Sequence, residues 1–145
     1  MKFRDDGALW WLCFEKDEPL RQTLECFLKE TDCSGGAITG IGAALDPLLG
    51  YFSLATNAHD QQQFRGFYEI TSMNGSVTLA EDGTPGFHLH GTFADERCHL
   101  IGGHIHDLTV GLTLEMVIYR SVWSLRRKTD KVTGVQLLDL SRCNL

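Results

Sequence analysis

The sequence predicts an α+β domain in which one main helix packs on a mostly antiparallel, twisted sheet. Short apolar runs of β-like character recur between turn signals, and only one stretch has the residue spacing of a helical face. The chain has 145 residues, 43% of them apolar, and contains no repeat, linker or low-complexity tract. That length suits one hydrophobic core better than two. We therefore expect a single domain over residues 1–145.

The predicted helix covers residues 20–29, where the apolar positions repeat at helical spacing. A strand at residues 8–14 comes before it, and a charged cluster followed by Pro19 separates the two elements. The face expected to be buried consists of Leu20, Leu24, Phe27 and Leu28.

The other predicted strands follow a pair of glycines at residues 35–36. Gly40 and Gly42 lie within the first of these strands and indicate that neighbouring backbone packs closely there. We expect turns at residues 73–76 and 81–85, which contain Asn-Gly and Asp-Gly pairs. The strands are expected at residues 37–45, 48–55, 64–73, 76–80, 87–93, 98–103, 108–119 and 132–140.

The net charge of −6 does not favour direct binding of nucleic acid, because non-specific affinity for phosphate rests on lysine and arginine. Residues 126–128, Arg-Arg-Lys, form the only basic cluster. Since this cluster lies between two strand-like runs, we interpret it as a solvated loop rather than a binding patch.

The cysteines and the N-terminus both indicate a reducing, cytoplasmic setting. The N-terminal apolar stretch is too short to span a bilayer, and no small-residue cleavage site follows a basic region, so no membrane partner is expected. The cysteines are odd in number and form no CxxC pair, which favours reduced thiols over a disulfide framework. They are Cys13, Cys26, Cys33, Cys98 and Cys143.

Histidines are concentrated between residues 86 and 106. His88 and His90 are two positions apart on a predicted strand, so their side chains emerge on the same face. A polar tip at residues 94–97 would turn the chain back and bring His104 beside them.

The register of that hairpin decides whether His104 can join the pair. If Phe93 pairs with Cys98, His104 lies opposite Phe87, on the wrong face of the sheet. We expect an extra bulged residue in the glycine pair 102–103 to correct this, because glycine tolerates bulges.

Three neutral imidazoles with an open fourth position suit Zn²⁺ best, while Ni²⁺, Co²⁺ and Fe²⁺ stay open as alternatives. A water bound at the open position would be acidified towards neutral pH. The competing interpretation is that these histidines are ordinary hydrogen-bonded sheet residues. The spacing of His88, His90 and His104 favours the metal site.

Other polar residues could contribute to this site. His106 shares the expected face of His104 and is a candidate fourth ligand or base, with a surface role as the alternative. Glu115 and Glu69 lie within apolar runs and are candidate catalytic groups: a general base, a metal ligand or support for a ligating histidine. The alternative for both acids is an outward-facing strand residue. We interpret His59 and His99 as surface residues.

Six sequence blocks in a fixed order resemble the PPC (plant and prokaryote conserved) domain family. The resemblance covers about residues 8–119. The blocks are Gly36-Ala-Ile-Thr-Gly-Ile-Gly-Ala, Leu49-Gly-Tyr-Phe, Gly66-Phe-Tyr-Glu-Ile-Thr-Ser-Met-Asn-Gly, His88-Leu-His, Ile101-Gly-Gly-His and Leu114-Glu-Met-Val-Ile.

The resemblance implies an α+β fold assembled as a homotrimer. In prokaryotic members the His-x-His and Gly-Gly-His blocks are associated with a bound metal, usually taken as zinc, which maps onto His88, His90 and His104. Plant members are nuclear and bind DNA through an AT-hook, a segment that this sequence lacks. A DNA-binding label can therefore reach this chain through the family name, while the charge and the missing hook argue against direct binding.

Two functional hypotheses follow. In the first, a trimeric metal-binding domain binds a small anionic or carbonyl ligand, or catalyses a metal-assisted hydrolysis or lyase step. In the second, the trimer is a non-catalytic interaction module, DNA-associated or regulatory as in the AT-hook relatives, and any metal is structural. A fourth protein ligand such as His106 or Cys98 would favour the second hypothesis, whereas a water in that position would favour the first.

Overall fold

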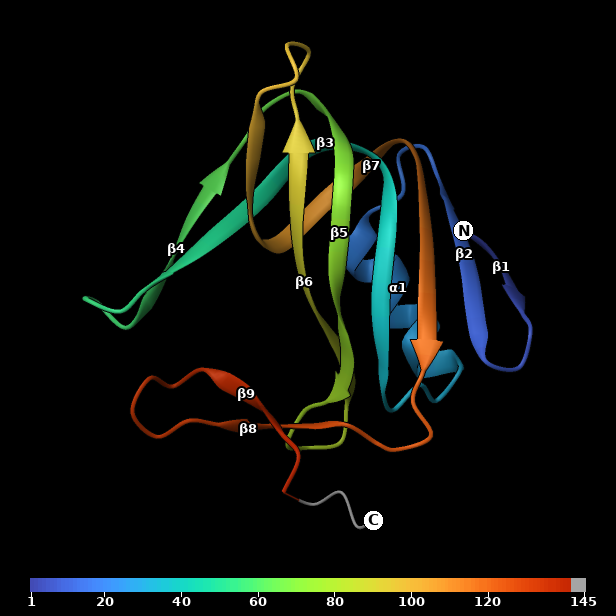
Figure 1. Ribbon diagram of the computed structural model, residues 1–145, viewed down its shortest axis with the longest axis vertical. Helices are drawn as coiled ribbons and strands as arrows, with labels where there is room; N and C mark the ends of the chain where they lie inside the picture. The colour runs from blue at the N-terminus through green and yellow to red at the C-terminus, as the bar shows by residue number, and fades with distance from the viewer. Residues whose placement is uncertain (142–145) are drawn as a thin grey trace.

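The computed structural model describes residues 1–141, which form one helix and nine strands (Figure 1). The helix is α1 (Leu20–Glu30), and the predicted α+β class is confirmed. The strands are β1 (Lys2–Asp5), β2 (Leu9–Glu15), β3 (Gly36–Ser53), β4 (Ala58–Gln63), β5 (Phe67–Leu79), β6 (Pro85–Ala94), β7 (Leu100–Arg120), β8 (Arg126–Thr129) and β9 (Gln136–Asp139).

The strands form one sheet whose main order is β1-β2-β7-β3-β5-β8-β9. Strand β4 extends β3 as a hairpin, and β6 pairs with both β5 and β7. The pairings β3–β5, β5–β6, β6–β7 and β7–β3 therefore close into a ring. Among the described residues all ladders are antiparallel except the single parallel bridge between β5 and β8.

Three pairs of predicted strands are in fact single long strands, namely β3, β5 and β7. The turn expected at residues 73–76 does not form. A β-carbon on Gly75 would lie 1.9 Å from the carbonyl oxygen of His88, so this glycine permits close backbone approach instead of a reversal. The gap expected around Asp46 and Pro47 is a register shift within β3.

Besides β8, the strands β1 and β4 were not predicted, because neither alternates between apolar and polar residues. All residues of β1 and β4 are exposed. The β3–β4 hairpin extends away from the rest of the molecule (Figure 1).

The helix forms as predicted, and its four apolar residues are all buried. It packs on the sheet and contacts β6 and β7; in Figure 1 it lies behind β3 and β7. Burial of each such side chain contributes roughly 1.5–3 kcal/mol relative to exposure, so this face holds the helix in place. No helix among residues 1–141 is both long enough and apolar enough to cross a membrane.

Strands β6 and β7 alternate between a buried face and an open face. Leu89, Phe93 and Ile105 are at most 1% exposed and belong to the core. Because strand side chains alternate, the residues next to them, including His90 and His104, point to the other side of the sheet. The candidate ligands therefore stand on strands anchored by the hydrophobic core.

The C-terminal segment forms the β8–β9 hairpin, which lies below the main sheet in Figure 1. The basic residues 126–128 belong to β8, so their interpretation as a loop was wrong. The strand expected at residues 132–140 is shorter, because residues 131–133 form a turn before β9.

Four of the cysteines are free thiols, as predicted, and Cys143 lies outside the described residues.

Candidate metal site

His90 pairs directly with His104 across the β6–β7 ladder. The ladder continues without a bulge to Phe93, which pairs with Ile101. The predicted pairing of Phe93 with Cys98, and the bulge expected in the glycine pair, were therefore wrong. Both histidines nevertheless share one face, as the metal hypothesis requires.

The loop between β6 and β7 sets this register. The side chain of Asp95 accepts hydrogen bonds from the backbone N–H groups of Arg97, at 2.8 Å, and His99, at 2.9 Å. Cys98 takes a left-handed conformation with φ 60°. The carboxylate thus organises a longer loop than the sequence suggested, and the added length replaces the expected bulge.

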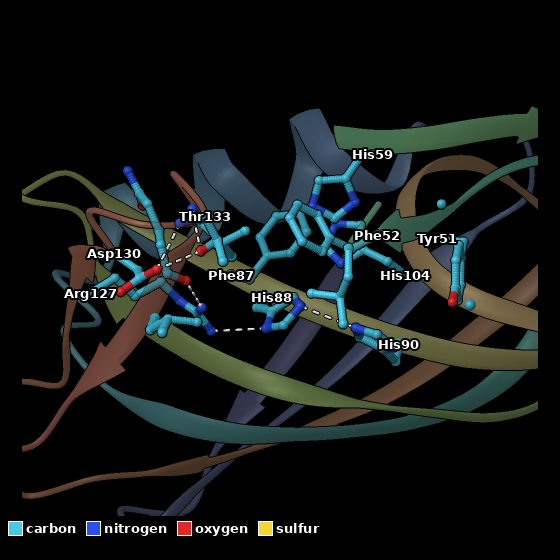
Figure 2. A pocket seen from close by; sticks show the side chains of 16 residues that line it. Tyr51, Phe52, His59, Phe87, His88, His90, His104, Arg127, Asp130 and Thr133 are labelled. Carbon is cyan, nitrogen blue, oxygen red and sulfur yellow. Dashed lines mark hydrogen bonds between the residues drawn. The ribbon is translucent and has the colours of Figure 1, made fainter. Parts of the chain in front are cut away.

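The nitrogen ligand atoms of His88, His90 and His104 all lie within 4.8 Å of one another. The Nε2 atoms of His88 and His90 are 3.2 Å apart (Figure 2). The ring centroids are separated by 4.9 Å from His88 to His104 and by 5.3 Å from His90 to His104. The three histidines that the sequence singled out thus converge on one point.

Burial makes two of these imidazoles hard to protonate. It lowers the pKa of His88 to about 4, and the positive charge of Arg127 acts in the same direction. Burial also lowers the pKa of His104 to about 3, together with the neighbouring His88. At neutral pH both rings are therefore uncharged, which is the form that binds a metal ion.

Arg127 contacts the cluster from β8. Its Nη2 atom lies 3.0 Å from Nδ1 of His88 (Figure 2). An arginine side chain only donates hydrogen bonds, so the network assigns Nδ1 of His88 as an acceptor and its Nε2 as the N–H that faces His90.

The cluster lies in the wall of a cavity of about 800 Å³. This volume is within the range of small-molecule sites. Residues of β3, β4, β6, β7 and the C-terminal hairpin line it (Figure 2). The apolar and aromatic side chains of the lining are Tyr51, Phe52, Leu54, Phe87, Val135 and Leu137.

His106 does not join the cluster in the described structure. Its ring centroid is 4.7 Å from that of His104, but it lies outside the group of converging ligand atoms and outside the cavity lining. It is the extra residue at a register shift of β7 against β3. Its Nε2 atom is buried without a hydrogen-bond partner among residues 1–141.

His59 was interpreted as a surface residue, and its side chain is indeed exposed, but it also lines the cavity. The β3–β4 hairpin brings its ring centroid to 5.5 Å from that of His104. The sequence could have indicated this position of His59 if a hairpin had been predicted between residues 48–55 and the polar residues that follow them.

Glu115 and Glu69 are exposed on their strands and do not line the cavity. Glu115 pairs with Cys13 of β2 and Ile41 of β3. His99, also interpreted as a surface residue, lies in the β6–β7 loop beside Asp95. The structure therefore places these residues apart from the three-histidine cluster.

The fold and the cluster define a class of protein: an α+β domain whose sheet presents three converging imidazoles to a cavity. The sequence matches the model of the Plants and Prokaryotes Conserved (PCC) domain over residues 1–122. The chain therefore belongs to this family, which is the PPC family that the sequence blocks resemble. No curated protein matches the sequence.

Solved structures share the fold along nearly the whole chain. A plant- and prokaryote-conserved protein from Pyrococcus horikoshii is 25% identical with a TM-score of 0.84, covering 95% of this chain and 94% of its own. A metal-containing protein from Archaeoglobus fulgidus is 25% identical with a TM-score of 0.82, covering 95% and 99%. A candidate DNA-binding protein from Bacteroides thetaiotaomicron is 23% identical with a TM-score of 0.92, covering 97% and 98%, and this likeness concerns the fold alone.

Proposed function

We propose that this chain is a metal-binding domain in which His88, His90 and His104 hold one divalent ion, zinc in the first instance. The observation that carries the proposal is the convergence of their ligand atoms within 4.8 Å at the wall of a cavity. The similar protein from Archaeoglobus fulgidus is described as metal-containing, which supports the same conclusion.

The residues present fit such an ion. All three donors are imidazole nitrogens, a set that suits zinc, nickel, cobalt and iron. Among the described residues no fourth protein ligand completes the group. A zinc ion held by three protein ligands keeps a position for water or substrate and can lower the pKa of a bound water.

The site therefore suits binding of a small ligand in the cavity, or a metal-assisted hydrolysis or lyase step. The residues of the chain would supply the ligand set, the shape of the cavity and a dry apolar wall. His59 lines the cavity and is better placed to exchange a proton with a ligand than Glu115 or Glu69, which do not.

Metal content tests this proposal directly. We would purify the chain without a histidine tag and measure zinc per chain for the wild type, His88→Ala and His104→Ala. His99→Ala is the matched control, because His99 lies in the neighbouring loop outside the cluster. We expect about one ion per chain in the wild type and the control, and loss in the other two variants while they stay folded. A wild-type chain that does not retain added zinc would overturn the proposal.

A non-catalytic interaction module is the second candidate, and exposed apolar side chains favour it. Trp11, Ile41 and Leu112, on the neighbouring strands β2, β3 and β7, are each more than half exposed, at 55%, 57% and 64%. Tyr51 and Leu54, at the β3–β4 hairpin, are also strongly exposed. Surfaces of this kind commonly contact other protein chains.

We propose that a homotrimer covers part of this surface, as the family resemblance implies. Within residues 48–52, Leu49 is buried in the chain itself, whereas Tyr51 is exposed and open to a neighbouring subunit. Sedimentation equilibrium of the metal-loaded chain should give three times the 16.2 kDa chain mass. A monomer at micromolar concentration would contradict the trimer.

Direct binding of DNA is not part of this proposal, because the net charge is −6.

A further inference from the structure

Arg127 brings a guanidinium group into the cavity from β8, outside residues 1–122 that the family model matches. Its neighbours Arg126 and Lys128 are exposed, whereas Arg127 is half-buried. Nε donates to Thr78 Oγ1 at 3.1 Å and Nη1 to the carbonyl oxygen of Gln136 at 2.7 Å. These contacts fix the direction of the charge towards the cavity.

No carboxylate among residues 1–141 forms an ion pair with Arg127. The acid in the cavity lining is Asp130, and its carboxylate accepts hydrogen bonds from the Val132 and Thr133 backbone and the Thr133 hydroxyl. A partly desolvated cation without a counter-ion attracts an anion, and a guanidinium matches the planar fork of a carboxylate.

Metal binding would release one donor of Arg127. In the described network Nδ1 of His88 accepts from Nη2 of Arg127. A ligating histidine ordinarily uses one ring nitrogen for the metal and donates an N–H from the other. If Nε2 of His88 binds the ion, Nδ1 becomes a donor, and one of the two N–H groups of Nη2 loses its acceptor while the other still donates to Oγ of Ser76 at 3.3 Å. An anionic oxygen of a ligand bound next to the metal would accept a hydrogen bond from this free N–H group.

The rest of the cavity offers apolar surface. Phe52 and Phe87 line it near the histidines (Figure 2), and the lining also includes Leu54 after β3 and Val135 and Leu137 of the C-terminal hairpin. Among the described lining residues Arg127 is the cation and Asp130 the acid, and the Asp130 carboxylate already accepts hydrogen bonds from Thr133. The lining therefore combines one charged end with an apolar body.

We propose that this cavity binds a small organic carboxylate with an apolar body, its carboxylate held by Arg127 next to the metal. The inference rests on the metal site proposed above and names the ligand class of that site. It also makes the C-terminal hairpin part of the binding site, although the hairpin lies beyond the family match.

Calorimetry with three probes tests the ligand class on wild-type chain loaded with zinc. Phenylacetate carries the carboxylate and an aromatic body, phenylacetamide keeps the shape without the charge, and acetate keeps the charge without the body. We expect phenylacetate to bind about tenfold more tightly than either of the others. Equal affinity of phenylacetate and phenylacetamide would overturn the proposal.

Variants assign the effect to Arg127. Arg127→Gln should weaken phenylacetate binding about tenfold while zinc content stays unchanged, and Arg127→Lys should weaken it less. Arg126→Gln is the matched control on the same strand and should bind like the wild type. An unchanged affinity in Arg127→Gln would refute the role of this residue. If Arg127→Gln fails to fold, the wild-type comparison of phenylacetate with phenylacetamide decides the question.

Zinc content, measured first, separates the two proposals. A wild-type chain without retained zinc contradicts the metal site itself. A chain that holds one zinc but does not distinguish phenylacetate from phenylacetamide leaves the metal site standing and rejects the carboxylate.

Discussion

Gly50 of β3 leaves the space that the imidazole of His106 occupies on β7: a β-carbon on Gly50 would lie 2.2 Å from Nε2 of His106. The contact occurs at one of the register shifts between β3 and β7, where His106 is an extra residue on β7. The glycine therefore accommodates the histidine bulge on β7, the strand that also carries His104.

Gly50→Ala should lower the free energy of unfolding by about 1 kcal/mol or more, because the ring of His106 has to move. Urea unfolding followed by circular dichroism measures the change. Gly86→Ala is the control, since a β-carbon there has no neighbour within 4 Å. Equal stability of the two variants would mean that the His106 ring moves aside without cost.

Gly75→Ala should be more disruptive, because the added atom meets backbone instead of a side chain. A β-carbon on Gly75 would lie 1.9 Å from the carbonyl oxygen of His88. We expect the free energy of unfolding to fall by about 3 kcal/mol, the upper end of the usual cost of overpacking. Zinc binding should also weaken, because His88 shifts. Zinc titration and thermal unfolding of the same sample measure both effects, and wild-type zinc affinity in a destabilised variant would argue against a coupling between β5 and the site.

Asp95→Ala should loosen the register of the β6–β7 hairpin. The carboxylate holds two backbone N–H groups of the loop, so its removal should cost about 1–2 kcal/mol and lower zinc affinity. Asp82→Ala is a matched control, because Asp82 holds the N–H of Thr84 in the neighbouring β5–β6 loop, away from the pairing of His90 with His104. Loss of zinc affinity in both variants alike would show that the loop does not act through register.

Stability of the metal-free protein should fall as the pH is lowered from about 6.5 to 4.5. In the unfolded chain a histidine has a pKa near 6.5, whereas in the folded chain His88 and His104 have pKa values of about 4 and about 3. Between these limits the unfolded chain binds more protons, so stability is fully present above pH 6.5 and is lost as the pH falls.

Thermal unfolding in the presence of a chelator checks this pH dependence. His104→Gln has no ionisable group at that position and should show a flatter decline between pH 6.5 and 4.5. A wild-type melting temperature that stays constant across this interval would contradict the predicted linkage.

The metal-site histidines could be found from the sequence because their geometry is local. His88 and His90 needed only the alternation of a strand, and His104 needed only a hairpin. The exact pairing was out of reach, since the hydrogen bonds of Asp95 lengthen the loop and remove the need for a bulge. Strand lengths were underestimated at Gly75, where a glycine that looks like a turn residue serves close packing.

Arg127 and His59 could not be placed from the sequence, because long-range contacts bring them to the site. Arg127 arrives with a hairpin that, within residues 1–141, joins the sheet at the bridge between Leu79 and Arg126 and through side-chain contacts of Arg127 with β5. His59 arrives on a wholly exposed strand that lacks an apolar pattern. In both cases the polar composition predicted a solvent-exposed segment, whereas the tertiary structure places a side chain of that segment at the cavity.

The alternation along β6 and β7 separates two kinds of evolutionary constraint. Inward positions such as Leu89 and Ile105 must keep their volume to preserve the core. Outward positions such as His90 and His104 can change in chemistry while the fold persists. A descendant of this domain could therefore exchange its imidazoles for other groups, lose the ion and acquire a different task, with its interior left unaltered.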